Sequence, residues 1–345
     1  MKTFFVQGME FTRSGLETWA WRKMREAPVW EKQHLLLILQ WLAPSSELVV
    51  YTSGSTGAPR PVSLPKSWLK SSAALTADFL GLRQRAEAWL PLPSAGIGGK
   101  MMIIRSLELG WHLQWQEPKA HMSLPDGLHV DITAMTPMQL IGLSDASFSR
   151  IGNMLVGGAG LTDAHRSKML HSGCRFIGTY GMTETGSHVA ICELNNSKGP
   201  DIYTALPGVT FEVDEWSCLI VDAAHLGHQR FITNDVVELS DRHHFRFIGR
   251  TDEAVNSGGV KIFPSQVEEK ISSFIHGAHV VHGVPDDILG SKLVLTIEGA
   301  PWQQSELDSL RMQMKSVLEP LMMPKEIRFS ENLARTESGK IKRII

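Results

Sequence analysis

The hydrophobic positions of the first half of the chain alternate between strand-like runs and helical repeats. Apolar residues recur at helical spacing over Leu16–Met24 and Leu35–Leu42, which predicts two amphipathic helices. From residue 48 to residue 178, apolar runs (Leu48–Tyr51, Ala88–Leu90, Val130–Ala134, Met154–Val156, Arg175–Gly178) are separated by helical segments (Trp68–Leu80, Lys100–Leu109, Pro137–Leu143, Thr162–His171). Strands that alternate with helices predict an α/β fold with a mostly parallel sheet.

After about Val189 the pattern changes to short apolar runs separated by turns, which predicts an antiparallel β subdomain. Beyond Gly249–Asp252 a smaller α+β unit is expected, with helices over Ser265–Phe274 and Ser305–Leu318. We therefore expect a large domain over residues 1–250 and a small C-terminal domain over residues 251–345.

Composition excludes several classes of protein. The 345 residues include 34 Lys and Arg against 36 Asp and Glu, so no basic excess points to a nucleic-acid partner. The three cysteines lie far apart and form no metal-type pair, and an odd, sparse set is typical of a reducing compartment. The apolar run at the N-terminus is too short for a signal peptide, and His34–Ala43 is too short for a membrane span. A cytoplasmic protein is expected.

Four polar segments are candidates for chemistry. The first, Thr52–Arg60 (TSGSTGAPR), follows a strand, and its small residues and hydroxyls could bind phosphate oxygens, although a plain Ser/Gly turn is equally consistent with it. It lacks the second glycine and the lysine of a Walker loop. The second, Gly178–Thr185 (GTYGMTET), places one carboxylate, Glu184, where it could bind Mg²⁺. The third joins Thr233–Asp235 with Gly249–Glu253, and the fourth is Arg335–Arg343.

In this order the four segments resemble the motifs of the adenylate-forming superfamily of acyl-CoA synthetases, luciferases and peptide-synthetase adenylation domains. The resemblance covers nearly the whole chain and implies ATP, Mg²⁺ and coenzyme A as ligands. It implies nucleotide contacts at Thr52, Ser53, Gly54, Ser55, Thr56, Gly57, Gly158, Ala159, Tyr180, Asp235 and Arg250. It implies catalytic roles for Lys340, Thr183 and Glu184, with Glu184 on the metal, a hinge at Asp252, and a coenzyme A tunnel beside Ser257, Gly258 and Gly259.

The sequence departs from the family pattern at several positions. Arg60 replaces the motif lysine, Asn234 a glycine, Glu253 an aspartate and Asn256 a frequent lysine. The phosphate loop starts at residue 52, so the long N-terminal subdomain of typical members is expected to be reduced to two helices. Substrate contacts from that subdomain are therefore in question.

The short form most resembles bacterial o-succinylbenzoate–CoA ligases of menaquinone biosynthesis. The segment Leu90–Met102 is similar to their substrate side, and we expect Lys100 or Arg105 to hold the carboxylate that is not activated. An alternative for both is an ordinary surface cation. Alternative functions are a ligase for another aryl or fatty acid, a ligase that loads a carrier protein, and a noncatalytic nucleotide-binding regulator.

Overall fold

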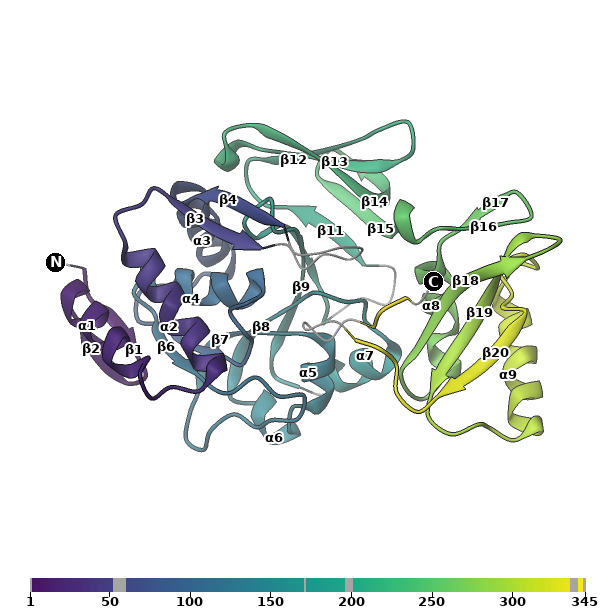
Figure 1. Ribbon diagram of the computed structural model, residues 1–345, viewed down its shortest axis with the longest axis horizontal. Coiled ribbons are helices and arrows are strands. Elements are labelled where there is room, and N and C mark those ends of the chain that lie inside the picture. The colour runs from purple at the N-terminus through teal and green to yellow at the C-terminus, as the bar shows by residue number, and fades with distance from the viewer. Residues whose placement is uncertain (1, 52–59, 171, 196–200, 336–340, 344–345) are drawn as a thin grey trace. The chain divides into compact units, whose positions relative to one another are not determined.

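The computed structural model describes residues 2–51, 60–170, 172–195, 201–335 and 341–343 (Figure 1). The chain forms two compact units. The first consists of Met1–Gly158, Lys168–Thr210 and Asp222–Phe231, and the second of Ala159–Ser167, Phe211–Val221 and Ile232–Ile345.

A mostly parallel sheet is the centre of the first unit, as the alternation of strands and helices predicts. Its strand order is β11-β10-β9-β8-β7-β5-β6-β1-β2, and every pairing from β9 to β1 along that order is parallel. The strands are β1 (Phe4–Val6), β2 (Met9–Phe11), β5 (Glu87–Leu90), β6 (His112–Trp115), β7 (Val130–Met135), β8 (Ile151–Val156), β9 (Arg175–Gly181), β10 (His188–Glu193) and β11 (Ile202–Ala205). The expected fold class is confirmed.

One predicted strand lies outside this sheet. β3 (Glu47–Tyr51) pairs antiparallel with β4 (Pro61–Pro65) in a separate two-stranded ribbon. Its side chains explain this placement, because Leu48 and Val50 are buried while Val49 and Tyr51 are exposed. A central parallel strand is covered on both faces, whereas this strand is buried on one face only.

Buried helices cover the parallel sheet. α4 is buried from Met101 to Leu107 and contacts β5, β6 and β7, while α2 and α3 pack on α4. The helices of the chain are α1 (Arg13–Lys23), α2 (Val29–Leu42), α3 (Lys66–Leu80), α4 (Ile97–Leu109), α5 (Pro137–Gly142), α6 (Asp145–Phe148), α7 (Asp163–Leu170), α8 (Pro264–Ile271) and α9 (Gln304–Val317). None of the helices in the described ranges is long and apolar enough to cross a membrane.

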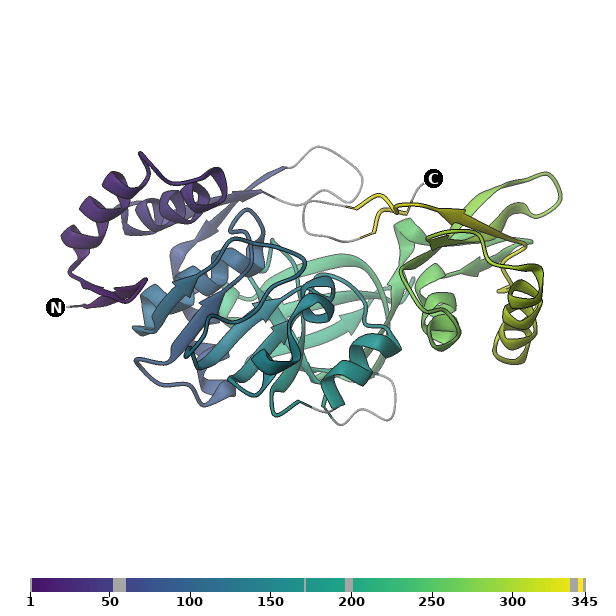
Figure 2. The ribbon, with the colours of Figure 1, turned by 90° about the horizontal axis from the view of Figure 1, so that it is seen from below.

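The second unit contains the strand-and-turn region and a small α+β body. The strands are β12 (Val209–Val213), β13 (Cys218–Ala223), β14 (Gln229–Asp241), β15 (His244–Arg250), β16 (Val255–Ser257), β17 (Val260–Ile262), β18 (His279–Asp286), β19 (Gly290–Glu298) and β20 (Glu326–Ser330). α8 and α9 lie against one face of the β18–β19–β20 sheet (Figure 2) and share a core with it. β20, which the sequence pattern did not predict, pairs parallel with β19.

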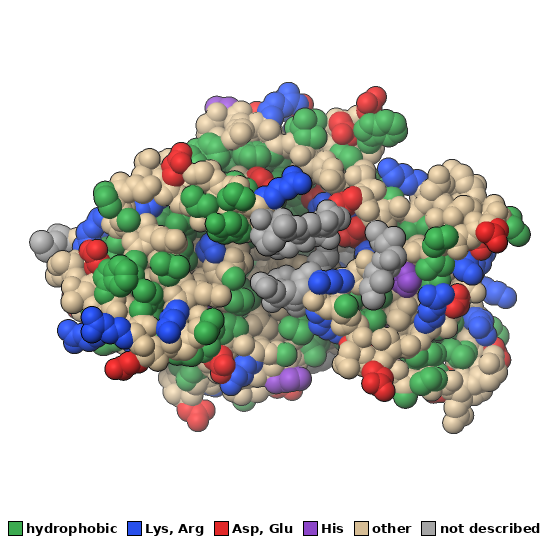
Figure 3. All heavy atoms as spheres, viewed as in Figure 1, with side chains coloured by type: hydrophobic (Ala, Val, Ile, Leu, Met, Phe, Trp, Pro, Cys, Tyr) green, Lys and Arg blue, Asp and Glu red, His purple; other side chains and the backbone are tan. Residues whose placement is uncertain are grey.

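Charged side chains of both signs are scattered over the face shown in Figure 3, and neither sign forms a continuous patch there. This distribution agrees with the formal net charge of -2. An anionic ligand must therefore be held by local geometry.

Candidate active site

The turn that carries Thr183 and Glu184 joins β9 to β10 and is held from within by Thr185. The Thr185 hydroxyl is buried, accepts a hydrogen bond from the N–H of Met182 at 3.1 Å, and donates to the carbonyl oxygen of Ser187 at 2.7 Å. Thr183 and Glu184 remain half-buried on this turn. The hydroxyl at Thr185 therefore fixes the backbone that presents both predicted catalytic side chains.

Gly181, the glycine of the same motif, is required by packing. A Cβ atom placed there would lie 2.3 Å from the carbonyl oxygen of Ser187 and 2.5 Å from the Cα of His188. Both neighbours are backbone atoms of the antiparallel partner β10, so they cannot move aside cheaply. Any side chain at residue 181 would displace the turn that carries Glu184.

Glu184 is suited to bind a metal ion. In the part of the chain that the structure describes, its carboxylate makes no hydrogen bond or ion pair, although the residue is half-buried. Within the same residues no three His, Cys, Asp or Glu side chains gather as a metal site. A hard cation here would depend on one carboxylate together with ligand oxygens, which is how Mg²⁺ is commonly held on phosphates.

Gly158 and Ala159, which the family resemblance places at the adenine pocket, follow β8, and Tyr180, another predicted nucleotide contact, lies near the end of β9. The Tyr180 ring packs edge-on against Tyr203, with 5.8 Å between the ring centroids. Gly158 adopts a left-handed φ of 89°, which turns the chain sharply after β8, and Ala159 beside it is exposed. The backbone at the end of β8 is therefore open, and the adenine contact stays a prediction.

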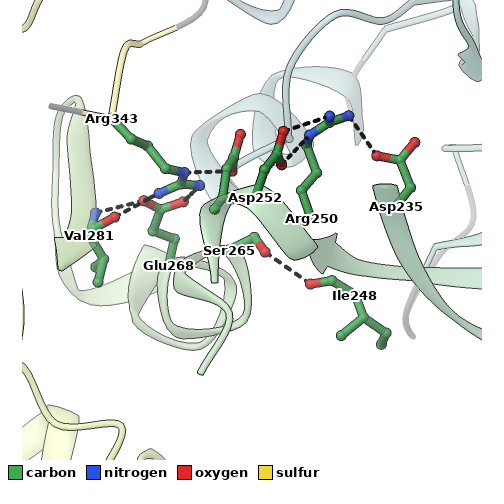
Figure 4. A network of polar contacts seen from close by, with 9 residues as sticks. Asp235, Ile248, Arg250, Asp252, Ser265, Glu268, Val281 and Arg343 are labelled. Carbon is green, nitrogen blue, oxygen red and sulfur yellow. Dashed lines mark hydrogen bonds and ion pairs between the residues drawn. The ribbon is translucent and has the colours of Figure 1, made fainter. Parts of the chain in front are cut away.

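Asp235 and Arg250 are brought together by the β14–β15 pairing, in which they are direct partners. The Arg250 guanidinium donates to Asp235 at 2.8 Å and to both oxygens of Asp252 at 2.9 and 3.0 Å (Figure 4). Burial alone would lower the pKa of Arg250, but its hydrogen bond to Asp252 and the charges of both carboxylates raise it above its usual range. The predicted ribose ligands thus form one ion-pair network with the predicted hinge residue.

The Ser257-Gly258-Gly259 segment is the tight turn of the β16–β17 hairpin. Gly258 and Gly259 have φ values of 59° and 82°, which is the backbone of a two-residue hairpin loop that glycine favours. Ser257 is buried, and Gly258 donates its N–H to the carbonyl oxygen of Leu289 at 2.9 Å. The turn geometry alone accounts for both glycines, so the coenzyme A contact stays a prediction.

Lys100 and Arg105, the two predicted substrate cations, are used differently by the structure. The Lys100 ammonium donates to the carbonyl oxygens of Ser94 and Ala95, the latter at 2.9 Å, and so closes the turn before α4. Burial lowers its pKa below the usual range. Lys100 therefore already has a structural function.

Arg105 is a buried cation that contacts no carboxylate in the described part of the chain. It is 2% exposed and donates to the Ser187 hydroxyl at 2.7 Å and towards Nδ1 of His188 at 3.4 Å. Among the described residues no carboxylate pairs with it, and its Nε has no hydrogen-bond partner. Burial lowers the pKa of Arg105 to about 9. An isolated buried charge is expensive, so this site favours an anion.

His188 keeps the Arg105 site cationic. Burial, followed by the charge of Arg105, holds the pKa of His188 well below its usual value, so the imidazole is neutral. Nδ1 then accepts from Arg105, and Nε2–H donates to the Thr76 hydroxyl at 3.1 Å, which itself donates to the carbonyl oxygen of Ser72. The chain of donors ends on a backbone acceptor, so it supplies no negative charge to Arg105.

Two predicted groups fall outside the described residues. They are the phosphate-loop positions Thr52, Ser53, Gly54, Ser55, Thr56 and Gly57, and the catalytic lysine Lys340. Sequence reasoning did not identify Ser187 and His188 as partners of Arg105, or Arg343 as the partner of Glu253 and Glu268. Ser187 and His188 directly follow a motif that was singled out, and Arg343 belongs to another. Their place in or near a motif could have drawn attention to them, but the side chains that they contact lie far away in the sequence, so the contacts could not be predicted.

Comparison with known proteins identifies related chains. The sequence model described as "AMP-binding enzyme" matches residues 32–229, more than half of the chain. The chain is 25% identical over 335 residues to a 2-succinylbenzoate–CoA ligase of Listeria monocytogenes, covering 89% of this chain and 71% of that protein.

Solved structures extend the comparison. An acyl-CoA synthetase (AMP-forming)/AMP-acid ligase II-like protein from Dyadobacter fermentans is 35% identical with a TM-score of 0.60, covering 95% of this chain and 96% of that one. The o-succinylbenzoate coenzyme A synthetase of Bacillus subtilis, solved with ATP and magnesium ion, is 20% identical with a TM-score of 0.71. That similarity covers 86% of this chain and 68% of the other, and shows the fold.

Proposed function

Because the chain belongs to the AMP-binding enzyme family, as an AMP-forming acid–CoA ligase, we propose that its acid substrate is o-succinylbenzoate, activated for menaquinone biosynthesis. In the first step a carboxylate oxygen of the acid attacks the α-phosphorus of ATP, and the bond to pyrophosphate breaks. In the second step the thiol of coenzyme A attacks the acyl carbon, loses its proton, and AMP leaves.

The observation that supports this substrate most directly is Arg105. A dicarboxylic acid activated at one end still carries a second negative charge, which must be held when the acid is desolvated. Arg105 is a buried guanidinium that no described carboxylate neutralises, and its Ser187 partner follows the turn that carries Glu184. A bidentate pair between guanidinium and carboxylate would satisfy both charges.

The remaining roles follow the family motifs. The loop from Thr52 to Gly57 binds the β- and γ-phosphates, Thr183 contacts the α-phosphate, and Asp235 with Arg250 binds the ribose. Residues 1–250 act as the large domain, and residues 251–345 as a small domain that rotates at Asp252. Lys340 stabilises the charge that develops on the α-phosphate and departing pyrophosphate. Rotation then withdraws Lys340 and opens the coenzyme A path beside Gly258.

Mg²⁺ would be held by Glu184, whose carboxylate has no partner in the described part of the chain. The ion supplies charge neutralisation to the phosphates. We expect Glu184→Gln to raise the Mg²⁺ concentration needed for half-maximal turnover by about 10-fold, because a neutral amide is a much weaker ligand for a hard cation. Initial rates measured over a Mg²⁺ series at saturating ATP check this.

The matched control for Glu184→Gln is Glu193→Gln, on the following strand β10, where the carboxylate pairs with Arg175. That variant should leave the Mg²⁺ dependence unchanged. An identical Mg²⁺ series for wild type and Glu184→Gln would remove Glu184 from the metal site.

The proposed function is tested by pyrophosphate release over a panel of acids with and without coenzyme A. o-Succinylbenzoate should give the largest kcat/KM, ahead of benzoate and a medium-chain fatty acid, and acyl-CoA should accumulate only when coenzyme A is present. A preference for a monocarboxylic acid contradicts the substrate. Transfer to a carrier protein in place of coenzyme A contradicts the acceptor. No pyrophosphate release with any acid would favour a noncatalytic nucleotide-binding regulator.

A further inference from the structure

Arg343 connects the C-terminal segment of the chain to three other elements of the second unit. Its Nε donates to Glu253 at 2.7 Å, and its two terminal nitrogens donate to the carboxylate of Glu268 on α8 at 2.5 and 2.8 Å. One of them also donates to the carbonyl oxygen of Val281 on β18 at 2.7 Å (Figure 4). One side chain therefore connects a 3₁₀ turn, a helix and a strand.

This contact is largely buried and strongly charged. The Arg343 side chain is 17% exposed, and Glu253 and Glu268 are 20% and 21% exposed. Burial alone would lower the pKa of Arg343, but its hydrogen bonds to Glu268 and the charges of both carboxylates raise it above its usual range. Glu268 is itself oriented, because it accepts the N–H of Val281 at 2.6 Å.

Arg335, Ile341 and Lys342, the described residues nearest to positions 336–340, are held as well. Arg335 forms an ion pair with Glu298 of β19 at 2.9 Å and a β-bridge with Ile341. The N–H of Lys342 donates to the carbonyl oxygen of Ala334 at 2.7 Å. The described residues on both sides of positions 336–340 are therefore anchored to the small α+β body.

The partner of Arg343 in the 3₁₀ turn is next to the predicted hinge. The turn η2 (Thr251–Glu253) carries two successive carboxylates that face different arginines. Asp252 pairs with Arg250 at the end of β15, whereas Glu253 pairs with Arg343. The contacts of one turn thus divide between the strand that precedes it and the C-terminal segment.

We propose that Arg343, three residues after Lys340, is a positioning residue for acyl-adenylate formation, which anchors the chain at its own position to the hinge turn through Glu253 and to α8 through Glu268. This rests on the proposed function, in which Lys340 acts in the first step only. Glu253, Glu268 and Arg343 all follow Asp252 in the chain, so they move together when the small domain rotates. Loss of the Arg343 contacts should therefore lower the rate of acyl-adenylate formation and leave the rate of thioester formation unchanged.

The decisive variants are Arg343→Ala and Glu253→Gln, with Arg328→Ala as the matched control. Arg328 lies exposed on β20, and among the described residues it forms an ion pair with Glu326 alone. Arg343→Ala should lower the rate of acyl-adenylate formation about 10- to 100-fold, because displacement of a catalytic group by about 1 Å costs up to that much. Thioester formation from supplied acyl-adenylate should stay within about 3-fold of wild type. Arg328→Ala should change neither.

Glu253→Gln distinguishes positioning from folding. It leaves the bidentate Arg343–Glu268 pair in place and removes the charged contact between Arg343 and the hinge turn. We expect the same selective loss of acyl-adenylate formation in Glu253→Gln. Arg343→Lys should recover most of the activity that Arg343→Ala loses. An equal fall of both half-reactions in Glu253→Gln would show a merely structural contact and overturn the proposal.

A double substitution tests whether Arg343 acts through Lys340. In a Lys340→Ala background, Arg343→Ala should lower acyl-adenylate formation by less than about 2-fold, since the group it positions is already gone. Multiplication of the two losses would overturn the proposal. If Lys340→Ala itself leaves acyl-adenylate formation unchanged, the proposed role of Lys340 fails, which is a separate result.

Hydrogen exchange tests the contacts of Arg343 with Glu253 and Glu268 without any measurement of enzyme activity. Exchange in the C-terminal peptide that contains the Lys342 amide should accelerate at least about 10-fold in Arg343→Ala and not in Arg328→Ala. The same rate in both variants overturns the proposal even in an active enzyme. If exchange is faster in Arg343→Ala but the protein releases no pyrophosphate, the anchoring by Arg343 is supported and the proposed function fails.

Discussion

Replacement of Lys340 by alanine is expected to lower the rate of acyl-adenylate formation by about 10²–10³-fold. A positioned charge that acts only in the transition state contributes ~3–4 kcal/mol, which corresponds to that factor. Thioester formation from pre-made o-succinylbenzoyl-adenylate should remain close to the wild-type rate, because the second step needs the lysine withdrawn. The two half-reactions are measured separately, by ATP–pyrophosphate exchange and by acyl-CoA formation from the supplied adenylate.

Lys342 provides the matched control for this experiment. It lies two residues further along, and its side chain is exposed. The hydrogen bond from its backbone N–H to the carbonyl oxygen of Ala334 does not depend on the side chain. Lys342→Ala should leave both half-reactions unchanged. Equal loss of both half-reactions in Lys340→Ala would mean that this lysine supports the structure of the domain and not the chemistry of one step.

Arg105→Met is expected to lower kcat/KM for o-succinylbenzoate by at least about 30-fold. Truncation of one partner of a buried charge pair costs ~2–5 kcal/mol, and the second carboxylate of the acid would lose its cation. The ratio of kcat/KM for o-succinylbenzoate to that for benzoate should therefore collapse. Thermal unfolding of the ligand-free protein should occur no earlier than in wild type, because an apolar side chain replaces a buried, uncompensated charge.

Lys100→Met is the comparison that separates a substrate contact from a structural one. Because Lys100 binds the carbonyl oxygens of Ser94 and Ala95, its loss should lower kcat/KM for both acids by a similar factor. A lower melting temperature of Arg105→Met with an unchanged ratio between the two acids would show that Arg105 supports the core through Ser187 and His188, and would remove it from the acid site.

The ion-pair network around Asp235, Arg250 and Asp252 shows how far motif reading can reach. Each residue was identified from a short pattern, and the structure places all three in contact, because β14 and β15 form a hairpin of local register. The hydrophobic pattern likewise identified the described helices except the short α6, and the central strands β5, β7, β8 and β9, since burial of one face repeats at the period of each element. These features depend on residues near one another in the chain.

Lys100 and Arg105 show where such reading stops. They lie five residues apart on one segment and were equivalent candidates, yet one closes a turn and the other is buried against Ser187 and His188. That difference comes from the contact of α4 with Ser187, which lies just before β10 and 82 residues after Arg105 in the chain. The same limit applies to β3. Its apolar run fits a central strand, and only the structure shows that one of its faces is exposed.

The sequence by itself determined the fold class, the order of the motifs and the family, because hydrophobic periodicity and motif composition are properties of local residue order. Only the tertiary structure decided which polar side chains share a partner: why Gly181 cannot carry a Cβ, why Arg105 lacks an anion among the described residues, and why Arg343 contacts the hinge turn. Charge pairing and steric contact depend on distances through space, and the chain sets those distances only after its elements have packed.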